Sequence, residues 1–230
     1  VGDILAVDLI DIELHDYGWQ AIVGGFGFLT DRFPEPKLNV HTIDTINKTT
    51  MFNGKVKIPL KPFPGVMGVA PDTEEMLSTI PPRANGGNMD DPSIVEGTTV
   101  YFPVFVKGAL FSIGDAHAVQ GLGEVCGTAI EAPMTFVYRL RVLKNKPAIQ
   151  EPQYETEDFY AVTGFGETID IATKKAVNFM VDHLSENYEI SAEDAYMLCS
   201  LVGDLKIAEI VDVPNMLVTM HFPKSILTQL

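Results

Sequence analysis

The sequence predicts a mainly β protein, with a sandwich-like or barrel-like body and a smaller α/β portion near the C-terminus. Short runs of β-branched and aromatic residues recur between glycines and prolines, whereas helical periodicity appears only late in the chain. The 230 residues are 46% hydrophobic, enough for one sizeable core or two small lobes sharing an interface. We expect a β-rich body over residues 1–165 that carries the site, and a helical pair with returning strands over residues 166–230, packed together as one unit.

The strands are expected in order along the first part of the chain. Residues 4–14 open the body, because apolar and acidic residues alternate over positions 7 to 14 as in a strand with one wet face. Residues 18–30 contain four glycines and suit an irregular loop or a bulged strand. Asn53-Gly54 predicts a hairpin turn between two further runs. Other short strands are expected at 38–45, 49–53, 55–60 and 98–106.

Two helices and two closing strands are expected in the last part. Apolar residues at helical spacing place one helix near 168–187. Ser191, with Asp194 three positions later, resembles a capping box, and Gly203 ends the helix that it begins. The runs at 206–212 and 216–222 predict the returning strands.

Charge and composition exclude several classes of partner. Sixteen Lys and Arg against 31 Asp and Glu give a formal charge of −15, which repels phosphate backbones and anionic lipids but not a neutral substrate. The apolar runs are shorter than the ~20 residues of a spanning helix, and we find no secretory leader. Cys126 and Cys199 fit neither a disulfide framework nor a zinc-thiolate site, so we expect a cytoplasmic protein with reduced thiols. The chain opens directly in a strand, and we expect residues upstream of it to be missing.

The long loop after residue 62 contains the first candidate site residues. Its polar centre, PPRANGGNMDDP, is long for a structureless connector, and such loops are usually functional. Asp90 could join an oxygen-rich metal shell, while Asn88 or the backbone N–H groups of Gly86-Gly87 could hold a carbonyl oxygen or an oxyanion. A tight multiple turn rich in Asn and Asp is the alternative interpretation.

The segment 108–131 is richer still in groups that bind metals and move protons. On a strand, Asp115 and His117 would point to the same face and offer a carboxylate and an imidazole to one ion. Glu124 could act as a general base if burial raises its pKa, and Gln120 and Glu131 lie in the same segment. The alternative is that Asp115 caps a turn and His117 is a half-buried structural histidine.

Other candidates are weaker. Cys126 lies beside carboxylates and has no cation near it in sequence, which disfavours a nucleophilic thiolate. Among the lone histidines, His41 is the next to examine, because it precedes the long loop in a β-like run. No nucleophile elbow, P-loop, dinucleotide fingerprint or H-E-x-x-H motif is present.

Three stretches together resemble the acetamidase/formamidase family: PFPGVMGVAP at 62–71, PPRANGGNMD at 81–90 and GDAHAVQGLGEVCGTAIE at 114–131. The likeness extends to GDILAVDLIDIEL near the start and SLVGDLKIAEIVD at 200–212, so it covers most of the chain. Leu122 departs from the acidic residue expected there, which affects the local charge or the substrate preference. The family's acidic and histidine-bearing motifs fall on Asn88, Asp90, Asp115, His117, Glu124 and Glu131.

The resemblance implies a β-rich amidase that cleaves formamide or acetamide to a carboxylate and ammonia and that self-associates as a dimer or larger. We expect Asp90, Asp115 and His117 to hold a divalent ion, zinc or calcium, which activates water. Glu124 and Glu131 are the expected catalytic residues, and Asn88 and Gly87 the substrate-binding residues. Hydrolysis of another small C–N substrate and a non-catalytic binding module of the same fold are the alternatives.

Overall fold

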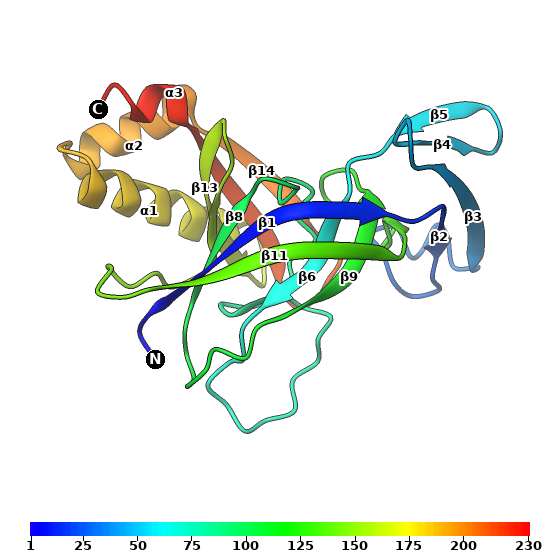
Figure 1. Ribbon diagram of the computed structural model, residues 1–230, viewed down its shortest axis with the longest axis horizontal. Coiled ribbons are helices and arrows are strands. Elements are labelled where there is room, and N and C mark those ends of the chain that lie inside the picture. The colour runs from blue at the N-terminus through cyan, green and yellow to red at the C-terminus, as the bar shows by residue number, and fades with distance from the viewer.

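The computed structural model describes all 230 residues as two antiparallel sheets with helices against one of them (Figure 1). The first sheet has seven strands, in the order β11 (Met134–Leu143), β1 (Ile4–Leu14), β8 (Thr99–Pro103), β12 (Gln153–Glu155), β13 (Phe159–Gly166), β15 (Met216–Pro223) and β14 (Asp204–Glu209). The second has eight, in the order β5 (Val56–Pro59), β4 (Thr49–Phe52), β3 (Lys37–Asp44), β2 (Tyr17–Ile22), β10 (Ile130–Glu131), β9 (Ser112–Val119), β6 (Phe63–Gly68) and β7 (Gly86–Asn88).

The two longer helices lie where the sequence predicts them, and a third, short helix was not predicted. Helix α1 (Ile169–Asn187) begins after Thr168, and α2 (Ala192–Val202) begins after Ser191, whose hydroxyl accepts from the Asp194 N–H. The short α3 (Lys224–Leu227) ends the chain beside them. Helix α1 packs closely on β13, because a Cβ at Gly164 would lie 2.2 Å from the carbonyl oxygen of Ala172. Glycine at this position therefore sets the separation of helix and sheet.

The main core fills the space between the two sheets. Fifteen buried residues form it, and they come from β1, β8, β12, β13, β14 and β15 of one sheet, from β6 of the other and from the connecting segments. A second cluster lies between α1, α2 and the seven-stranded sheet. The predicted β-rich class with a late helical portion is confirmed. Strands β14 and β15 share a sheet with β1, while the division at residue 165 stays a prediction.

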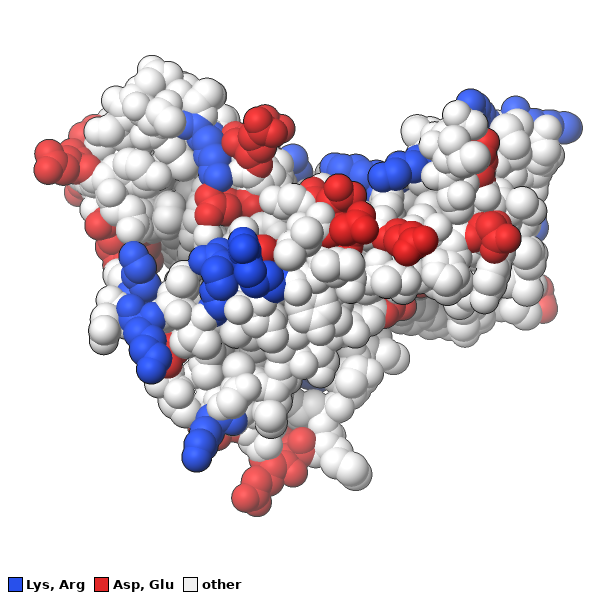
Figure 2. Space-filling view, viewed as in Figure 1, with Lys and Arg blue, Asp and Glu red and all other residues white.

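Strand β1 differs from the expected strand with one wet face. Residues 4–9 are all buried, because β8 and β11 flank the strand and the core lies beneath it. Asp8 is tolerated there because it accepts from Arg141 at 2.6 Å and 2.8 Å and from Arg139 at 2.9 Å. Lys and Arg side chains gather over β11 on the face seen in Figure 2. The regular alternation begins only after the bulge near residue 10.

Strands β2 to β5 form an arm that projects from the body (Figure 1). The arm carries exposed apolar side chains, among them Leu38, Val40, Met51 and Val56. These side chains leave apolar surface open along the arm.

No helix combines the length and the apolarity that crossing a bilayer requires.

Asp8→Asn is expected to lower the free energy of unfolding by about 1 kcal/mol at pH 7. A hydrogen bond to a charged group contributes about 1.5–3 kcal/mol, and the partial exposure of both arginines reduces that value. The hydrogen bond from Arg141 holds the pKa of Asp8 well below its usual range. The stabilisation is therefore present above the unfolded pKa of about 3.9 and is lost as the pH falls.

Thermal unfolding at pH 7 and pH 3 measures this effect. We expect the melting temperature of Asp8→Asn to lie about 2–4 °C below that of the wild type at pH 7, with the gap narrowing at pH 3. Asp11→Asn, an exposed change on the same strand, is the control and should change little. An equal gap at both pH values would contradict the role of the ion pair.

Candidate functional site

One row of strands in the eight-stranded sheet brings the predicted site residues together. Glu131 of β10 is paired with His117 of β9. On its other side β9 pairs with β6, and β6 pairs with β7, where Val66 lies opposite Asn88. Segments that are distant in sequence thus meet across neighbouring strands, and Asp90 follows directly after β7.

His117 lies at the centre of this group and is only 1% exposed. Its Nδ1 lies 3.6 Å from an oxygen of Asp90. Its Nε2 lies 3.6 Å from an oxygen of Asp115 and 3.0 Å from an oxygen of Glu131. Burial alone would lower the pKa of His117, but hydrogen bonds to Asp115 and Glu131 outweigh it and raise the pKa to about 11. Carboxyl groups therefore flank both nitrogens of one buried ring.

Gln120 fixes the orientation of that ring. Its amide nitrogen donates to the carbonyl oxygen of Asp90 at 2.6 Å and to that of Ala208 at 3.4 Å. Its amide oxygen consequently faces Nδ1 of His117, at 2.9 Å. Because an amide oxygen only accepts, Nδ1 carries a hydrogen, and Nε2 is the nitrogen that can present a lone pair when the ring is neutral.

The Nδ1 side of the ring is a buried cluster of acids. Asp90, His117 and Glu124 each bring a ligand atom within 4.8 Å of the others. Burial raises the pKa of Asp90 well above its usual range and that of Glu124 to about 8. Burial also raises the pKa of Asp212 to about 6 and that of Glu209 to about 8. One oxygen of Asp90 is buried without any hydrogen-bond partner.

The Nε2 side is more accessible. Asp115, His117 and Glu131 also bring ligand atoms within 4.8 Å of one another. The Asp115 side chain is 42% exposed, whereas that of Asp90 is 2% exposed. The hydrogen bond from His117 lowers the pKa of Asp115. Nε2 is therefore the ring nitrogen on the side nearer to solvent.

Backbone geometry at the site is unusual. Asp90, Asp115 and Glu124 have φ values of 42°, 48° and 44°, in the left-handed region that non-glycine residues rarely adopt. Gly65 of β6 makes room for Asp90 and His117, since a Cβ there would lie 2.5 Å from an Asp90 oxygen and 2.9 Å from the His117 ring. Strained carboxylate residues around a space kept by glycine are typical of a functional site.

A cavity of about 270 Å³ adjoins the acidic cluster. Gln120 and Glu124 belong both to the cluster and to the cavity wall, and Leu122 lies half exposed on the same wall. Asn88 lies beside the cluster and donates to Asp212 at 2.7 Å, which leaves its other amide N–H and its oxygen for a ligand. Gly87 precedes it on β7, with φ of 98° and open space around it.

Neither of the weaker candidates, Cys126 and His41, bonds to His117, although Cys126 lines the same cavity as Glu124. The Cys126 thiol lies 3.3 Å from the carbonyl oxygen of Thr128 and 3.6 Å from the amide nitrogen of Gln20, with no basic side chain bonded to it. His41 is buried in the arm and stacks on Phe52, and neither of its ring nitrogens has a hydrogen-bond partner.

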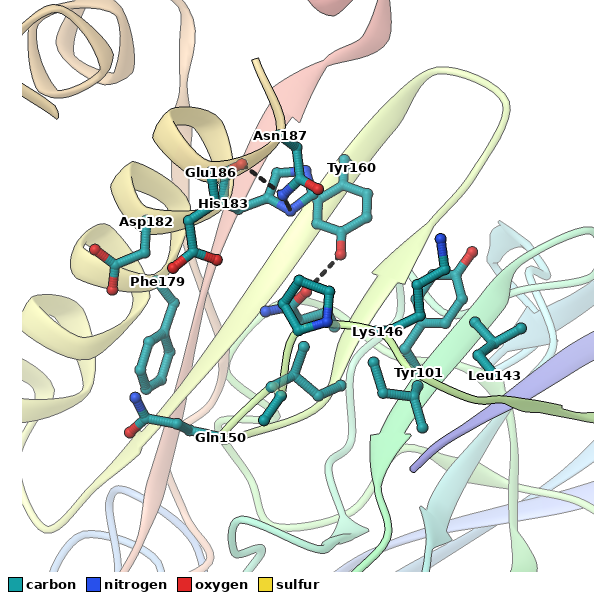
Figure 3. A pocket seen from close by; sticks show the side chains of 15 residues that line it. Tyr101, Leu143, Lys146, Gln150, Tyr160, Phe179, Asp182, His183, Glu186 and Asn187 are labelled. Carbon is teal, nitrogen blue, oxygen red and sulfur yellow. Dashed lines mark hydrogen bonds between the residues drawn. The ribbon is translucent and has the colours of Figure 1, made fainter. Parts of the chain in front are cut away.

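A second cavity, of about 340 Å³, lies between α1 and the seven-stranded sheet (Figure 3). Tyr160 and His183 stack face to face in it with ring centroids 3.9 Å apart. None of the residues of the His117 group lines this cavity.

Three contributors escaped the sequence analysis. Glu209 and Asp212 come from the end of β14 and the turn after it, and Gly65 comes from β6. The two acids stand three positions apart in an otherwise apolar run, KIAEIVD, which is the signal that could have suggested them. Their approach to His117 depends on how the two sheets face each other, and sequence spacing does not contain that information.

Comparison with known proteins identifies the family of this chain. A family model described as the Acetamidase/Formamidase family matches residues 1–78 and 73–229. A formamidase of Methylophilus methylotrophus is 25% identical over 300 aligned residues, which cover 98% of this chain and 73% of that protein. A predicted acetamidase/formamidase of Thermoanaerobacter tengcongensis is 34% identical with a TM-score of 0.93, covering 99% of this chain and 74% of its own.

An acetamidase of Bacillus halodurans gives the same picture. It is 30% identical with a TM-score of 0.93, and the match covers 100% of this chain and 76% of that one. The two solved structures and the family model together span both sheets and the helical portion. The chain belongs to the acetamidase/formamidase family.

Proposed function

We propose that this protein is an amidohydrolase that cleaves short aliphatic amides, such as formamide and acetamide, to a carboxylate and ammonia. The observation that carries the proposal is the buried His117 ring with carboxyl groups at both nitrogens, in a chain whose family relatives are named formamidase and acetamidase. The adjoining cavity of about 270 Å³ suits a small substrate. A neutral amide also enters without repulsion from a chain of net charge −15.

The residues present fit a divalent cation. On the Nε2 side of the ring, Asp115, His117 and Glu131 bring ligand atoms within 4.8 Å of one another. A positive charge held there would also relieve the repulsion among the buried acids Asp90, Glu124 and Asp212, whose pKa values are raised by burial. One imidazole nitrogen with carboxylate oxygens suits zinc or manganese, and calcium if further oxygens join. A divalent ion held there supplies a water of lowered pKa and polarises the amide carbonyl.

Nε2 of His117, Asp115 and Glu131 are the ligands that we assign to this ion. Nδ1 is occupied by its hydrogen bond to Gln120, so only Nε2 is available. Asp115 and Glu131 lie on the Nε2 side, whereas Asp90 lies on the Nδ1 side, 3.6 Å from that nitrogen. This proposal exchanges the roles first expected for Asp90 and Glu131. Nε2 must lose its proton to become a ligand, and ion binding should therefore release a proton.

Glu124 is the proposed proton carrier, with Asp90 beside it. A carboxyl group whose pKa is raised to about 8 can carry a proton at neutral pH. It can donate that proton and then take up another. Amide hydrolysis needs this, because the departing nitrogen must be protonated. Glu124 also lines the cavity, so a bound amide would lie against it. Asn88, whose second amide N–H is unused by Asp212, is the proposed donor to the carbonyl oxygen, whereas Gly87 lines a separate cavity of about 430 Å³.

Self-association is a separate proposal. Leu38, Val40, Met51 and Val56 expose apolar surface along the arm, and such surface is typical of an interface. We expect a homo-oligomer that uses the arm.

Ammonia release from formamide and acetamide tests the proposed activity. We expect turnover that falls on chelation and returns with zinc or manganese. His117→Ala should lower kcat by about 100-fold or more and reduce the bound metal, while His15→Ala, an exposed change, should alter neither. A His117→Ala variant that keeps both its activity and its metal would overturn the assignment. An active site that prefers another C–N substrate would appear in a wider substrate panel.

Gln120→Met tests the orientation of the His117 ring. The side chain keeps its length but loses the amide that holds Nδ1, and loss of such a hydrogen bond typically costs about 10–100-fold in metal affinity. Calorimetric titration with zinc or manganese measures the loss. Gln20→Met is the matched control, because Gln20 bonds to Cys126 and not to the histidine. Equal affinities of the two variants would contradict the role of Gln120.

A further inference from the structure

A buried line of hydrogen bonds runs through the seven-stranded sheet to the residue next to Asp90. The hydroxyl of Tyr154 donates to a carboxylate oxygen of Asp91 at 2.5 Å and lies 2.9 Å from Nε2 of His221. Nδ1 of His221 lies 3.2 Å from the ammonium of Lys206. Asp91, Tyr154 and His221 are 1%, 0% and 3% exposed. None of these residues has a part in the proposed chemistry.

The donors and acceptors of this line are all matched. Lys206 can only donate, so Nδ1 of His221 accepts and Nε2 carries the hydrogen. That hydrogen is shared between the oxygens of Tyr154 and Thr219, the second at 3.0 Å. Burial lowers the pKa of His221 to about 3, which keeps the ring neutral. The line thus joins a cation at one end to a carboxyl group at the other through two neutral side chains.

The line of hydrogen bonds ends at Asp91, the residue that follows Asp90 in the chain. The backbone of Asp90 is left-handed, with φ of 42°, and a residue so strained keeps its place only if its surroundings hold it. On one side the N–H groups of Met89 and Asp90 donate to the Gly65 carbonyl oxygen of the eight-stranded sheet, at 3.0 Å and 3.1 Å. On the other side Tyr154, on β12, holds Asp91 from the seven-stranded sheet.

The remaining bonds to Asp91 are local. The Ser93 N–H donates to its carboxylate at 2.9 Å, and the Ile94 N–H donates to its carbonyl oxygen at 3.0 Å. These bonds would move with the turn if the turn shifted. The hydroxyl of Tyr154 instead ties the turn to a distant strand, 63 positions along the chain.

We propose that Tyr154, supported by His221 and Lys206, is a positioning residue that holds Asp91 and thereby places the Asp90 carboxyl group for amide hydrolysis. The inference rests on the proposed function for its catalytic consequence, but not for its structural part. A misplacement of about 1 Å in a catalytic group can lower a rate by about 100-fold. Loss of the Tyr154 hydroxyl should therefore affect kcat more than KM.

Tyr154→Phe is the variant that tests the proposal, and Tyr160→Phe is the matched control. Tyr160 also donates a 2.5 Å hydrogen bond, to Gln153, but its ring lies in the cavity of Figure 3, away from Asp90. We expect Tyr154→Phe to lower kcat for acetamide by about 10-fold or more with KM within about two-fold. Tyr160→Phe should leave both unchanged. Lys206→Met, at the far end of the line, should give a smaller loss than Tyr154→Phe.

Hydrogen exchange gives a readout that is independent of activity. In Tyr154→Phe we expect faster exchange of the peptide spanning residues 86–94, where the Met89 and Asp90 N–H groups lie, and unchanged exchange there in Tyr160→Phe. A Tyr154→Phe variant with wild-type kcat, or with wild-type exchange in this peptide, would overturn the positioning role. A wild-type protein that hydrolyses no amide would instead overturn the proposed function, and the exchange experiment would still test the position of Asp90.

Discussion

Packing several carboxyl groups around one buried imidazole ring is the constraint on which the rest of this structure depends. Each of these groups loses hydration on burial, and like charges at this distance cannot all ionise without a compensating charge. Burial accordingly raises the pKa values of Asp90 and Glu124, while hydrogen bonds to Asp115 and Glu131 raise that of His117. A bound cation would stabilise the charged carboxylates, and its binding would therefore release protons from the site.

The site also depends on both sheets. The eight-stranded sheet supplies His117, Asp115, Glu131 and the space at Gly65. Asp212 and Glu209 come from the end of the other sheet, and the carbonyl oxygen of Ala208 holds Gln120 from there. The geometry of the site thus depends on how the two sheets pack. A change in the core between them would shift the groups around His117.

Local signals in the sequence predicted much of this fold. Helical spacing and the capping residue Ser191 act within a few positions, so the place of α1 and the start of α2 followed from the sequence. The hairpin at Asn53-Gly54 is likewise local. Burial of Asp8 on β1 was not predictable, because its partners Arg139 and Arg141 lie 131 and 133 positions later in the chain. A partner at that separation leaves no mark in the local pattern.

The candidate site was predicted in part for the same reason. Asp115 and His117 share a strand, and the residues of the long loop carried recognisable polar motifs. Which carboxyl group faces which ring nitrogen depends on strand register and on Gln120, and neither can be read from spacing. Glu209 and Asp212 were missed because they approach from the other sheet.

The left-handed backbone at Asp90, Asp115 and Glu124 has a consequence for how such a chain evolves. Glycine adopts this conformation freely, whereas other residues pay about 1 kcal/mol or more. A lineage released from selection for turnover could therefore gain thermal stability by exchanging any of the three for glycine, and each exchange would delete a carboxyl group. Inactive descendants of this fold should therefore be recognisable, because they should lose these three acidic residues before they lose their core.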